Sequence, residues 1–297
     1  MRNAKSCQAT IQRMNPGPSP HPSSLQGVSH YENFPVASLL CPPHLRPAIA
    51  AIYWFARTAD DIADEGDALP QARLDDLAAY RADLMATAAG RAPSPRWADV
   101  FGRLGPVIRQ FALPVNLLAD LLSAFEQDVV KQRYASQAEL LDYCRRSANP
   151  VGRLLLHLYG VKDAPSLIES DCICSALQLI NFWQDLGVDI PRGRIYLPAD
   201  AWAPHGVDEA QLLGLQSNQN TINLIATHVS QASAMMLKGS QLVKKVPGRG
   251  GWELRLVVQG GLRILDKIAA QGFDTLQRRP KLGAWDVAVM GWRALWM

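Results

Sequence analysis

The apolar residues of the chain recur with the period of an α-helix from Pro43 onward. Near the start of this region, five positions follow the i, i+3, i+4, i+7 spacing of one buried face: Leu45, Ile49, Ile52, Tyr53 and Ala56. The same spacing predicts further helices within residues 70–90, 114–130, 139–160, 166–190, 220–246 and 251–273. Gly and Pro fall between these blocks, and the alternation typical of strands is absent. We therefore predict a single all-α domain.

The two ends of the chain differ from this helical region. Residues 1–27 are rich in Pro and Ser and poor in large apolar residues, which is typical of a disordered tail. Their basic, acid-free composition would also suit a transit peptide, but no Arg-rich amphipathic helix accompanies it. We place the folded domain at 28–283. The final segment, 284–297, is amphipathic and rich in Trp, and it would pack on the core or a partner, or lie on a membrane surface.

Composition excludes several classes of protein. The net charge of +3 is too small to indicate nucleic-acid binding. The five cysteines are odd in number, and no secretory segment precedes them, so we expect a reducing, cytoplasmic setting rather than a disulfide framework. No run of 18 apolar residues is present, so no membrane-spanning segment is predicted.

Carboxylates are concentrated directly after the first apolar block. Five of them lie between Ala56 and Asp67, where Arg57 is the sole base. Asp60 and Asp64 are four residues apart, so on a helix they share one face, with Cβ atoms roughly 6 Å apart. We call this pair the first motif. Such a pair repels itself unless a cation lies nearby, and Mg²⁺ suits two carboxylates with water or phosphate completing its shell. The alternative is a solvated helix end.

A second polar group interrupts a predicted helix that is otherwise apolar nearly all round. Asn181, Asp185 and Asp189, which we call the second motif, follow one another at i+4 steps, and Arg194 comes shortly afterwards. Buried carboxylates need a partner. Two helices that each present Asp pairs, with arginines beside them, are suited to a diphosphate bridged by Mg²⁺. The apolar surroundings would line a dry cavity for a hydrocarbon cation. The residues thus indicate Mg²⁺-dependent isoprenoid diphosphate chemistry.

Four stretches resemble the squalene and phytoene synthase family: "AIYWFARTADDIAD", "YCRRSANPVG", "LQLINFWQDLGVD" and "GRIYLP". The resemblance covers residues 28–283 and implies an isoprenoid synthase-type helical bundle around a central cavity, with Mg²⁺ as cofactor. It assigns the metal ligands to both motifs: Asp60, Asp64, Asn181, Asp185 and Asp189. It assigns three residues to the substrate diphosphate, namely Arg57, Arg194 and Tyr196, and it places Tyr143 and Gln178 at the reacting centre.

The chain also departs from the family pattern. Gln184 stands where the family usually has an arginine, "SANP" at 147–150 replaces a "VAG" element, and Glu32 lies where diphosphate contacts are expected. The loss of a cation and the gain of an acid suggest that only one diphosphate is bound. This resembles the hydroxysqualene synthase branch, in which presqualene diphosphate ionises and water captures the cation without NADPH. Glu32 and Tyr143 are candidates for orienting that water, ahead of Asn149.

Two alternatives remain open at this point. The same fold could condense two prenyl diphosphates head to head, giving presqualene diphosphate, squalene or phytoene. A non-catalytic isoprenoid-binding subunit is the other alternative, and the intact Asp pairs of both motifs argue against it. The expected partner is an isoprenoid diphosphate substrate and not a nucleic acid, and contacts with a membrane surface or with pathway enzymes stay open.

Overall fold

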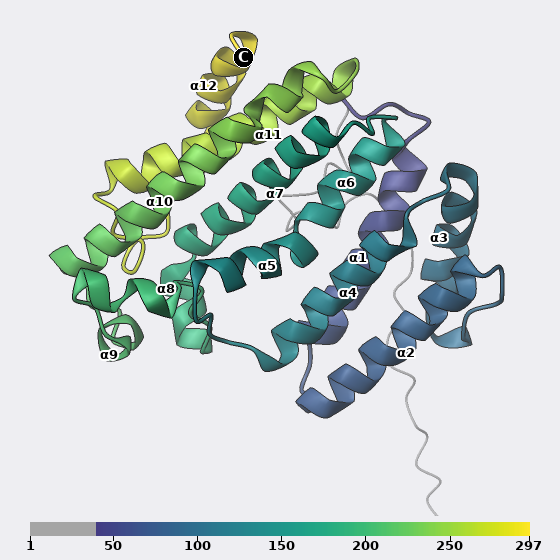
Figure 1. Cartoon of the computed structure of the whole chain (residues 1–297), viewed down its shortest axis with the longest axis horizontal. Coiled ribbons are helices and arrows are strands. Elements are labelled where there is room, and N and C mark those ends of the chain that lie inside the picture. The colour runs from purple at the N-terminus through teal and green to yellow at the C-terminus, as the bar shows by residue number, and fades with distance from the viewer. Residues whose placement is uncertain (1–39) are drawn as a thin grey trace, which may run out of the picture. The chain divides into compact units, whose positions relative to one another are not determined.

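The computed structural model describes residues 40–297, and these residues form a helical body (Figure 1). The predicted tail at 1–27 and the candidate Glu32 lie outside the described residues. The prediction of an all-α fold is confirmed, because β pairing within 40–297 is limited to one isolated bridge between Arg133 and Ile195. No helix in this part of the chain combines the length and the apolarity needed to cross a membrane.

The α-helices are α1 (Arg46–Asp64), α2 (Pro70–Ala88), α3 (Ala98–Phe111), α4 (Val115–Val130), α5 (Gln137–Ser147), α6 (Asn149–Leu158), α7 (Ala164–Gln184), α8 (Leu186–Asp189), α9 (Glu209–Leu213), α10 (Gln219–Gly239), α11 (Arg249–Ala270) and α12 (Ala284–Leu295). Short 3₁₀-helices lie between them: η2 (Pro95–Trp97), η3 (Ile190–Arg192), η4 (Ala199–Ala201), η5 (Ala203–His205) and η6 (Ser240–Lys244).

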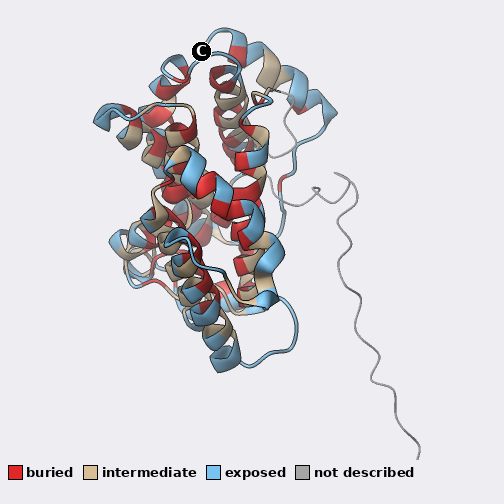
Figure 2. Cartoon of the chain, turned by 90° about the vertical axis from the view of Figure 1, so that its right-hand side faces the viewer, coloured by how far each residue is buried: buried red, intermediate tan, exposed pale blue. Residues whose placement is uncertain are grey.

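The predicted apolar faces are the faces that pack. The five positions of the first helical pattern are all buried, and α1 packs against α2, α3 and α4. Helix α7 lies between α6, α10 and α11, with Ile173, Ile180 and Trp183 in the core. The buried residues accordingly run along the inner faces of the helices, whereas exposed residues cover the outer faces (Figure 2). Burial of these apolar stripes is the main force that holds the bundle together.

Two predicted helices are each divided in the structure. The block at 139–160 breaks at Ala148 between α5 and α6, because Pro150 has no amide N–H to donate to the preceding turn and is tolerated only in the first turn of a new helix. The block at 166–190 breaks at Asp185. Here Gly187 donates its amide to the carbonyl of Thr275, 3.2 Å away, instead of to the preceding helical turn. The prediction of one unbroken helix was therefore wrong at both points.

Gly187 allows the distant segment 275–280 to reach the end of α7. A Cβ atom at this position would lie 2.6 Å from the backbone oxygen of Leu276, closer than folded proteins tolerate. Glycine is thus required by the close approach of two backbones and not by an unusual φ angle. As a consequence, a segment about 90 residues further along the chain is held against the second motif.

Candidate active site

The first motif lies at the end of α1, where one arginine is surrounded by acids. Arg57 donates to Asp60 at 3.3 Å and lies 2.7 Å from the carboxylates of Asp61 and Glu65. Burial, together with the neighbouring Asp64, raises the pKa of Asp60 to about 6. Asp61 and Glu65 thus make the shorter contacts with the guanidinium, and the neighbouring charges of Asp60 and Asp64 repel each other, which favours a bound cation.

The three residues of the second motif stay on one helical face despite the break between α7 and α8. The amide of Asp185 donates to the carbonyl of Asn181 at 3.0 Å, and the amide of Asp189 donates to that of Asp185 at 2.9 Å. These i+4 bonds carry the helical repeat across the junction of α7 and α8, so the three side chains remain in line. Burial, with the charge of Asp185, raises the pKa of Asp189 to about 6. The arrangement mirrors that of the first motif.

Arg194 joins the first motif to the segment that follows the second. Its two terminal nitrogens donate to both carboxylate oxygens of Asp64, one of them at 3.1 Å, although the two residues are 130 positions apart. The extended chain after Gly193 is fixed by the amide of Ile195, which donates to the carbonyl of Gln132 at 3.0 Å. Hydrogen bonds to Asp64 raise the pKa of Arg194. The amide of Arg194 also donates to the carbonyl of Asp189 at 3.0 Å, so this one residue contacts both motifs.

Asp128 completes the site and was missed by the sequence reasoning. It lies on α4, and the hydroxyl of Tyr143 on α5 donates to its carboxylate at 2.9 Å. Low polarity around Asp128 raises its pKa to about 7, while Tyr143 and Arg194 oppose that rise. A signal was present, since Asp128 continues the buried stripe of Leu121 and Ala124 at i+7 and i+4. A carboxylate on an apolar stripe needs a partner, and Tyr143 supplies it.

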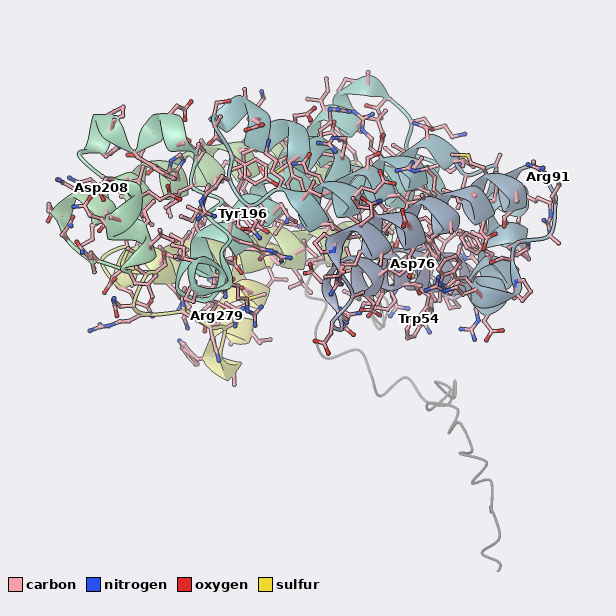
Figure 3. All side chains as sticks on the ribbon, turned by 90° about the horizontal axis from the view of Figure 1, so that it is seen from below. Trp54, Asp76, Arg91, Tyr196, Asp208 and Arg279 are labelled. Carbon is pink, nitrogen blue, oxygen red and sulfur yellow. The ribbon has the colours of Figure 1, made fainter. Side chains whose placement is uncertain are left out.

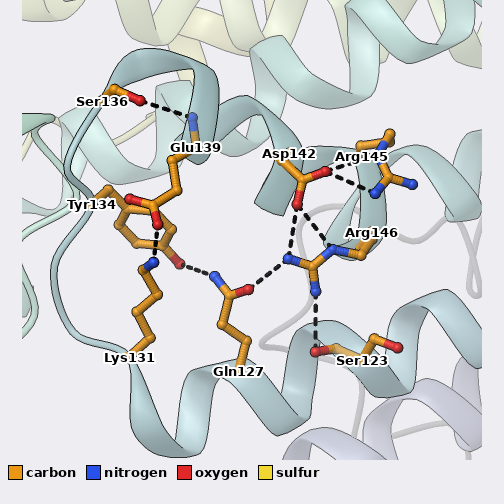
Figure 4. A network of polar contacts seen from close by, with 9 residues as sticks. All are labelled: Ser123, Gln127, Lys131, Tyr134, Ser136, Glu139, Asp142, Arg145 and Arg146. Carbon is orange, nitrogen blue, oxygen red and sulfur yellow. Dashed lines mark hydrogen bonds and ion pairs between the residues drawn. The ribbon is translucent and has the colours of Figure 1, made fainter.

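A polar clamp beside this pair fixes α5 against α4 (Figure 4). Arg146 donates to the side chain of Gln127 at 2.5 Å and to the backbone carbonyl of Ser123 at 3.3 Å, and it also contacts Asp142 on its own helix. Both clamp residues on α4 precede Asp128, and Gln127 is its direct neighbour in sequence. Because the two helices are tied at this point, Asp128 and Tyr143 are held facing each other.

Aromatic rings form one wall of the site. Tyr196, predicted to bind diphosphate, is buried and stacks on Phe182 with ring centroids 3.7 Å apart and planes 7° from parallel. Tyr134 and Tyr143 lie beside them, with centroids 5.6 Å apart. Since its ring is covered by Phe182, Tyr196 can reach a diphosphate through its hydroxyl alone. Aromatic faces of this kind attract a cation.

An apolar pocket adjoins the polar residues. It lies between α6, α7, η6 and α11, is lined by Leu156, Leu177 and Leu254 among others, and has an empty volume of about 680 Å³ with its open mouth included. On α7, the lining residues Cys174 and Leu177 fall on the same helical stripe as Asn181, at seven and four residues before it. At 1.5 Å per residue, the pocket begins about 6 Å along the helix from Asn181.

The segment after α11 adds an arginine that the sequence did not indicate. Gln184 is buried, and its amide donates to the carbonyl of Pro280 at 2.7 Å. The neighbouring Arg279 donates to both oxygens of Asp185, at 2.5 and 3.0 Å (labelled in Figure 3 with Tyr196). Arg279 therefore places a cation on Asp185, next to Gln184. The inference that only one diphosphate is bound stays a prediction.

The remaining candidates are placed less centrally. Gln178 on α7 is partly buried, one residue beyond Leu177 of the pocket. Asn149 is buried between α6 and α7, where its side-chain oxygen accepts a hydrogen bond from Ser175 at 2.8 Å, so that oxygen is already engaged. Glu32 stays a prediction, because it falls outside the described part of the chain.

The carboxylate oxygens of the two motifs suit a Mg²⁺ ion whose remaining ligands are phosphate oxygens of the substrate. Within residues 40–297, no three His, Cys, Asp or Glu side chains converge as a preformed cage. Instead, carboxylates stand in pairs, with arginines bound to Asp64 and Asp185. Mg²⁺ is commonly bound by one or two carboxylates together with water and substrate phosphate. The raised pKa of Asp60 and of Asp189 marks positions at which an added cation would relieve repulsion.

Comparison with known proteins agrees with this geometry. A model of the family described as squalene/phytoene synthase matches residues 28–286. The chain belongs to the squalene/phytoene synthase family. It is an enzyme of that family, whose members act on isoprenoid diphosphates.

This chain resembles individual relatives over most of its length and of theirs. The chain is 34% identical to a hydroxysqualene synthase from Sinorhizobium fredii, over 88% of this chain and 86% of that protein. It is 30% identical to a presqualene diphosphate synthase from Rhodopseudomonas palustris, over 89% and 93%. A crystal structure of a squalene synthase from Alicyclobacillus acidocaldarius superimposes with a TM-score of 0.76 at 37% identity, over 82% of this chain and 90% of that one.

Proposed function

We propose that this enzyme converts presqualene diphosphate to hydroxysqualene, with Mg²⁺ bound at the two carboxylate motifs. The observation that carries the proposal is the contact of Arg194 with Asp64, because it joins both motifs into one polyanion-binding end beside an apolar pocket. Support for this reaction within the family comes from three relatives named hydroxysqualene synthase, which are 34%, 36% and 38% identical to this chain.

The diphosphate would be bound by exchange of partners. Arg57, Arg194 and Arg279 are each occupied by carboxylates now, and each can turn to diphosphate oxygens through charge-assisted hydrogen bonds. The carboxylates released in this way, with Asn181, are the groups that would hold Mg²⁺. When bound, Mg²⁺ would neutralise the charge that develops on the leaving diphosphate. Ionisation breaks the carbon–oxygen bond, and the electron pair leaves with the diphosphate.

The hydrocarbon cation would be held between the aromatic wall and the apolar pocket. The aromatic wall that includes Tyr134, Tyr143 and Phe182 attracts positive charge, and the pocket excludes bulk water from the rearranging cation. One water molecule then forms the new carbon–oxygen bond, and its proton passes to a base. Asp128 can accept that proton, since its half-buried carboxylate lies beside this wall, and Tyr143 orients it. The balance consumes water and no reductant, so NADPH is not required.

Head-to-head condensation of two prenyl diphosphates is the second candidate. The contact of Arg279 with Asp185 favours it, because that cation restores the charge expected for a second diphosphate. The relative named presqualene diphosphate synthase, at 30% identity, is consistent with it as well.

Product analysis separates the two reactions. With Mg²⁺ and presqualene diphosphate, the purified protein should form hydroxysqualene in the absence of NADPH, and oxygen-18 from labelled water should enter the alcohol. Farnesyl diphosphate alone should give no product. Formation of presqualene diphosphate or squalene from farnesyl diphosphate would establish the condensation instead.

Substitutions in the motifs test the catalytic assignment itself. Asp60→Asn and Asp185→Asn should each lower activity by at least about 100-fold, with a higher Mg²⁺ requirement. Asp76→Asn is a matched control, since Asp76 on α2 forms an ion pair with Arg96 at the surface. If all three variants retain activity, the motifs do not bind metal and diphosphate.

A further inference from the structure

Helix α12 is attached to α11 by polar contacts, while its tryptophans point away. Its single acid, Asp286, is buried and accepts hydrogen bonds from Arg263 at 2.7 Å and Lys267 at 2.6 Å. Arg293 pairs with Asp266 on α11 at 2.6 Å, and Arg255 donates to the carbonyl of Ala294 at 3.1 Å. The helix therefore packs on the core, as one of the sequence alternatives expected, but through Asp286 and Ala294 and not through its aromatic stripe.

The outward side of α12 is a large exposed apolar surface. Trp285, Trp292 and Trp296 are exposed by 77%, 63% and 77%, and we call these three side chains the tryptophan face. They fall on one stripe at i+7 and i+11 from the first, and the last two rings contact each other with centroids 5.8 Å apart. Leu282 and Leu295 are also exposed. An ordinary protein surface carries scattered single apolar residues, whereas here three exposed tryptophans lie together on one helix.

The charge around the tryptophan face is positive. Segment 278–297 contains four basic residues and one acid, and that acid is the buried Asp286. Arg278 and Lys281, just before α12, are exposed, and neither forms an ion pair with any described residue. Two cations without an ion-pair partner in residues 40–297 thus lie beside the tryptophan face, and segment 278–297 has no exposed acid. This combination is complementary to a layer of anionic headgroups over hydrocarbon.

We propose that the tryptophan face binds the surface of a membrane containing anionic lipid, with Arg278 and Lys281 at the level of the headgroups. Indole rings prefer this boundary, because the ring is apolar and its N–H remains near water. Ion pairs on the inner side of α12 hold the helix in place, so its outer side can bind without leaving the core. Arg279, between the two cations, contacts Asp185, so the docked segment is continuous with the polar end of the active site.

Vesicle flotation of the full chain tests the proposal without substrate, so its result is independent of the assigned reaction. The wild type should float with vesicles of phosphatidylcholine and phosphatidylglycerol. The combined variant Trp285→Ser, Trp292→Ser, Trp296→Ser should show a partition coefficient at least about tenfold lower. A matched control replaces three large apolar residues exposed elsewhere, Ile168→Ser, Leu213→Ser and Leu237→Ser, and should float like the wild type.

The electrostatic part has its own variant. Arg278→Glu with Lys281→Glu should weaken binding to the anionic vesicles by about fivefold or more for each charge, with little change on pure phosphatidylcholine. If the triple Trp variant does not fold, Trp285→Ser and Trp296→Ser alone serve, since both side chains are exposed by 77%. The proposal is overturned if the wild type does not float, or if the Trp variant and the control float equally. It is also overturned if light scattering detects a lipid-free dimer that the Trp variant abolishes, because a second copy then covers the face.

Discussion

The hydroxyl of Tyr143 donates to the carboxylate of Asp128 at 2.9 Å, which links α5 to α4 beside both carboxylate motifs. Burial raises the pKa of Tyr143 well above its usual value and that of Asp128 to about 7. The pair therefore holds one dissociable proton at neutral pH in a setting of low polarity. Asp128 also feels the charges of Arg194 and of the first motif, so its state is coupled to what those residues bind.

Removal of the tyrosine hydroxyl should slow the chemical step more than it weakens binding. In Tyr143→Phe, the carboxylate of Asp128 loses its donor and its orientation, so kcat should fall by about 10- to 100-fold while KM changes little. Tyr134→Phe is the control, because Tyr134 belongs to the same aromatic wall but its hydroxyl contacts Gln127 at 3.3 Å. Steady-state kinetics of both variants decide the matter, and equal losses in kcat would refute a specific role for Tyr143.

The stability of the metal-free protein should depend on Asp128 and on pH. Its pKa is higher in the folded state, about 7, than the ordinary 3.8, so the folded state binds the proton more tightly. The charged carboxylate thus costs stability above pH 7, and this cost fades as the pH falls towards 4. Asp128→Asn removes the cost, so it should raise Tm more at pH 8 than at pH 5.

A carboxylate with the opposite shift provides the control for this pH dependence. Hydrogen bonds from Arg145 lower the pKa of Asp142, whose charge is therefore favourable in the folded state above its ordinary pKa. Asp142→Asn should lower Tm slightly at pH 8, because the group is at the surface and screened. Thermal melts of the two variants from pH 5 to pH 8 give the comparison, and a gain for Asp128→Asn that is the same at every pH would contradict the titration.

Replacement of Arg194 by lysine should damage the site although it keeps the charge. Lysine cannot donate to both oxygens of Asp64 at once, and it loses the planar fork that fits a diphosphate. We expect kcat/KM for the diphosphate substrate to fall by about 10- to 100-fold. Arg145→Lys, on an exposed pair with Asp142, should stay within about twofold of the wild type. Similar values for both variants would show that charge alone suffices at Arg194.

An added methyl group at Gly187 should detach the segment that carries Arg279. Its Cβ atom would meet the backbone oxygen of Leu276 at 2.6 Å, so either the backbone shifts or the segment moves away. Gly187→Ala should therefore cost about 1–3 kcal/mol of stability and raise KM for the diphosphate. Gly102→Ala in α3 has nothing within 4 Å of its Cβ and should stabilise by about 0.5–1 kcal/mol. A stabilised Gly187→Ala variant with normal KM would exclude the close packing.

The local features of this protein are determined by the sequence. The 3.6-residue period of apolar positions specifies the helices, and i+4 spacing places Asp60 with Asp64 and Asn181 with Asp185, because both effects act within one or two turns. A Gly or Pro that can interrupt a helix is also visible in the local sequence. Which carbonyl then accepts the freed amide is not, because the amide can bond to any carbonyl that approaches it. That Gly187 would bond to Thr275 could not be predicted from its neighbours.

The tertiary structure alone decided which faces meet. Arg194 lies 130 residues from Asp64, and Arg279 lies 94 residues from Asp185, and no periodic pattern relates such distant positions. The same holds for α12, where the sequence specified an aromatic stripe but not the side of the helix that would pack. Two ion pairs with α11 turned Asp286 inward and left the tryptophans outside. A helical pattern fixes which residues share a face, and only packing against other helices decides what that face contacts.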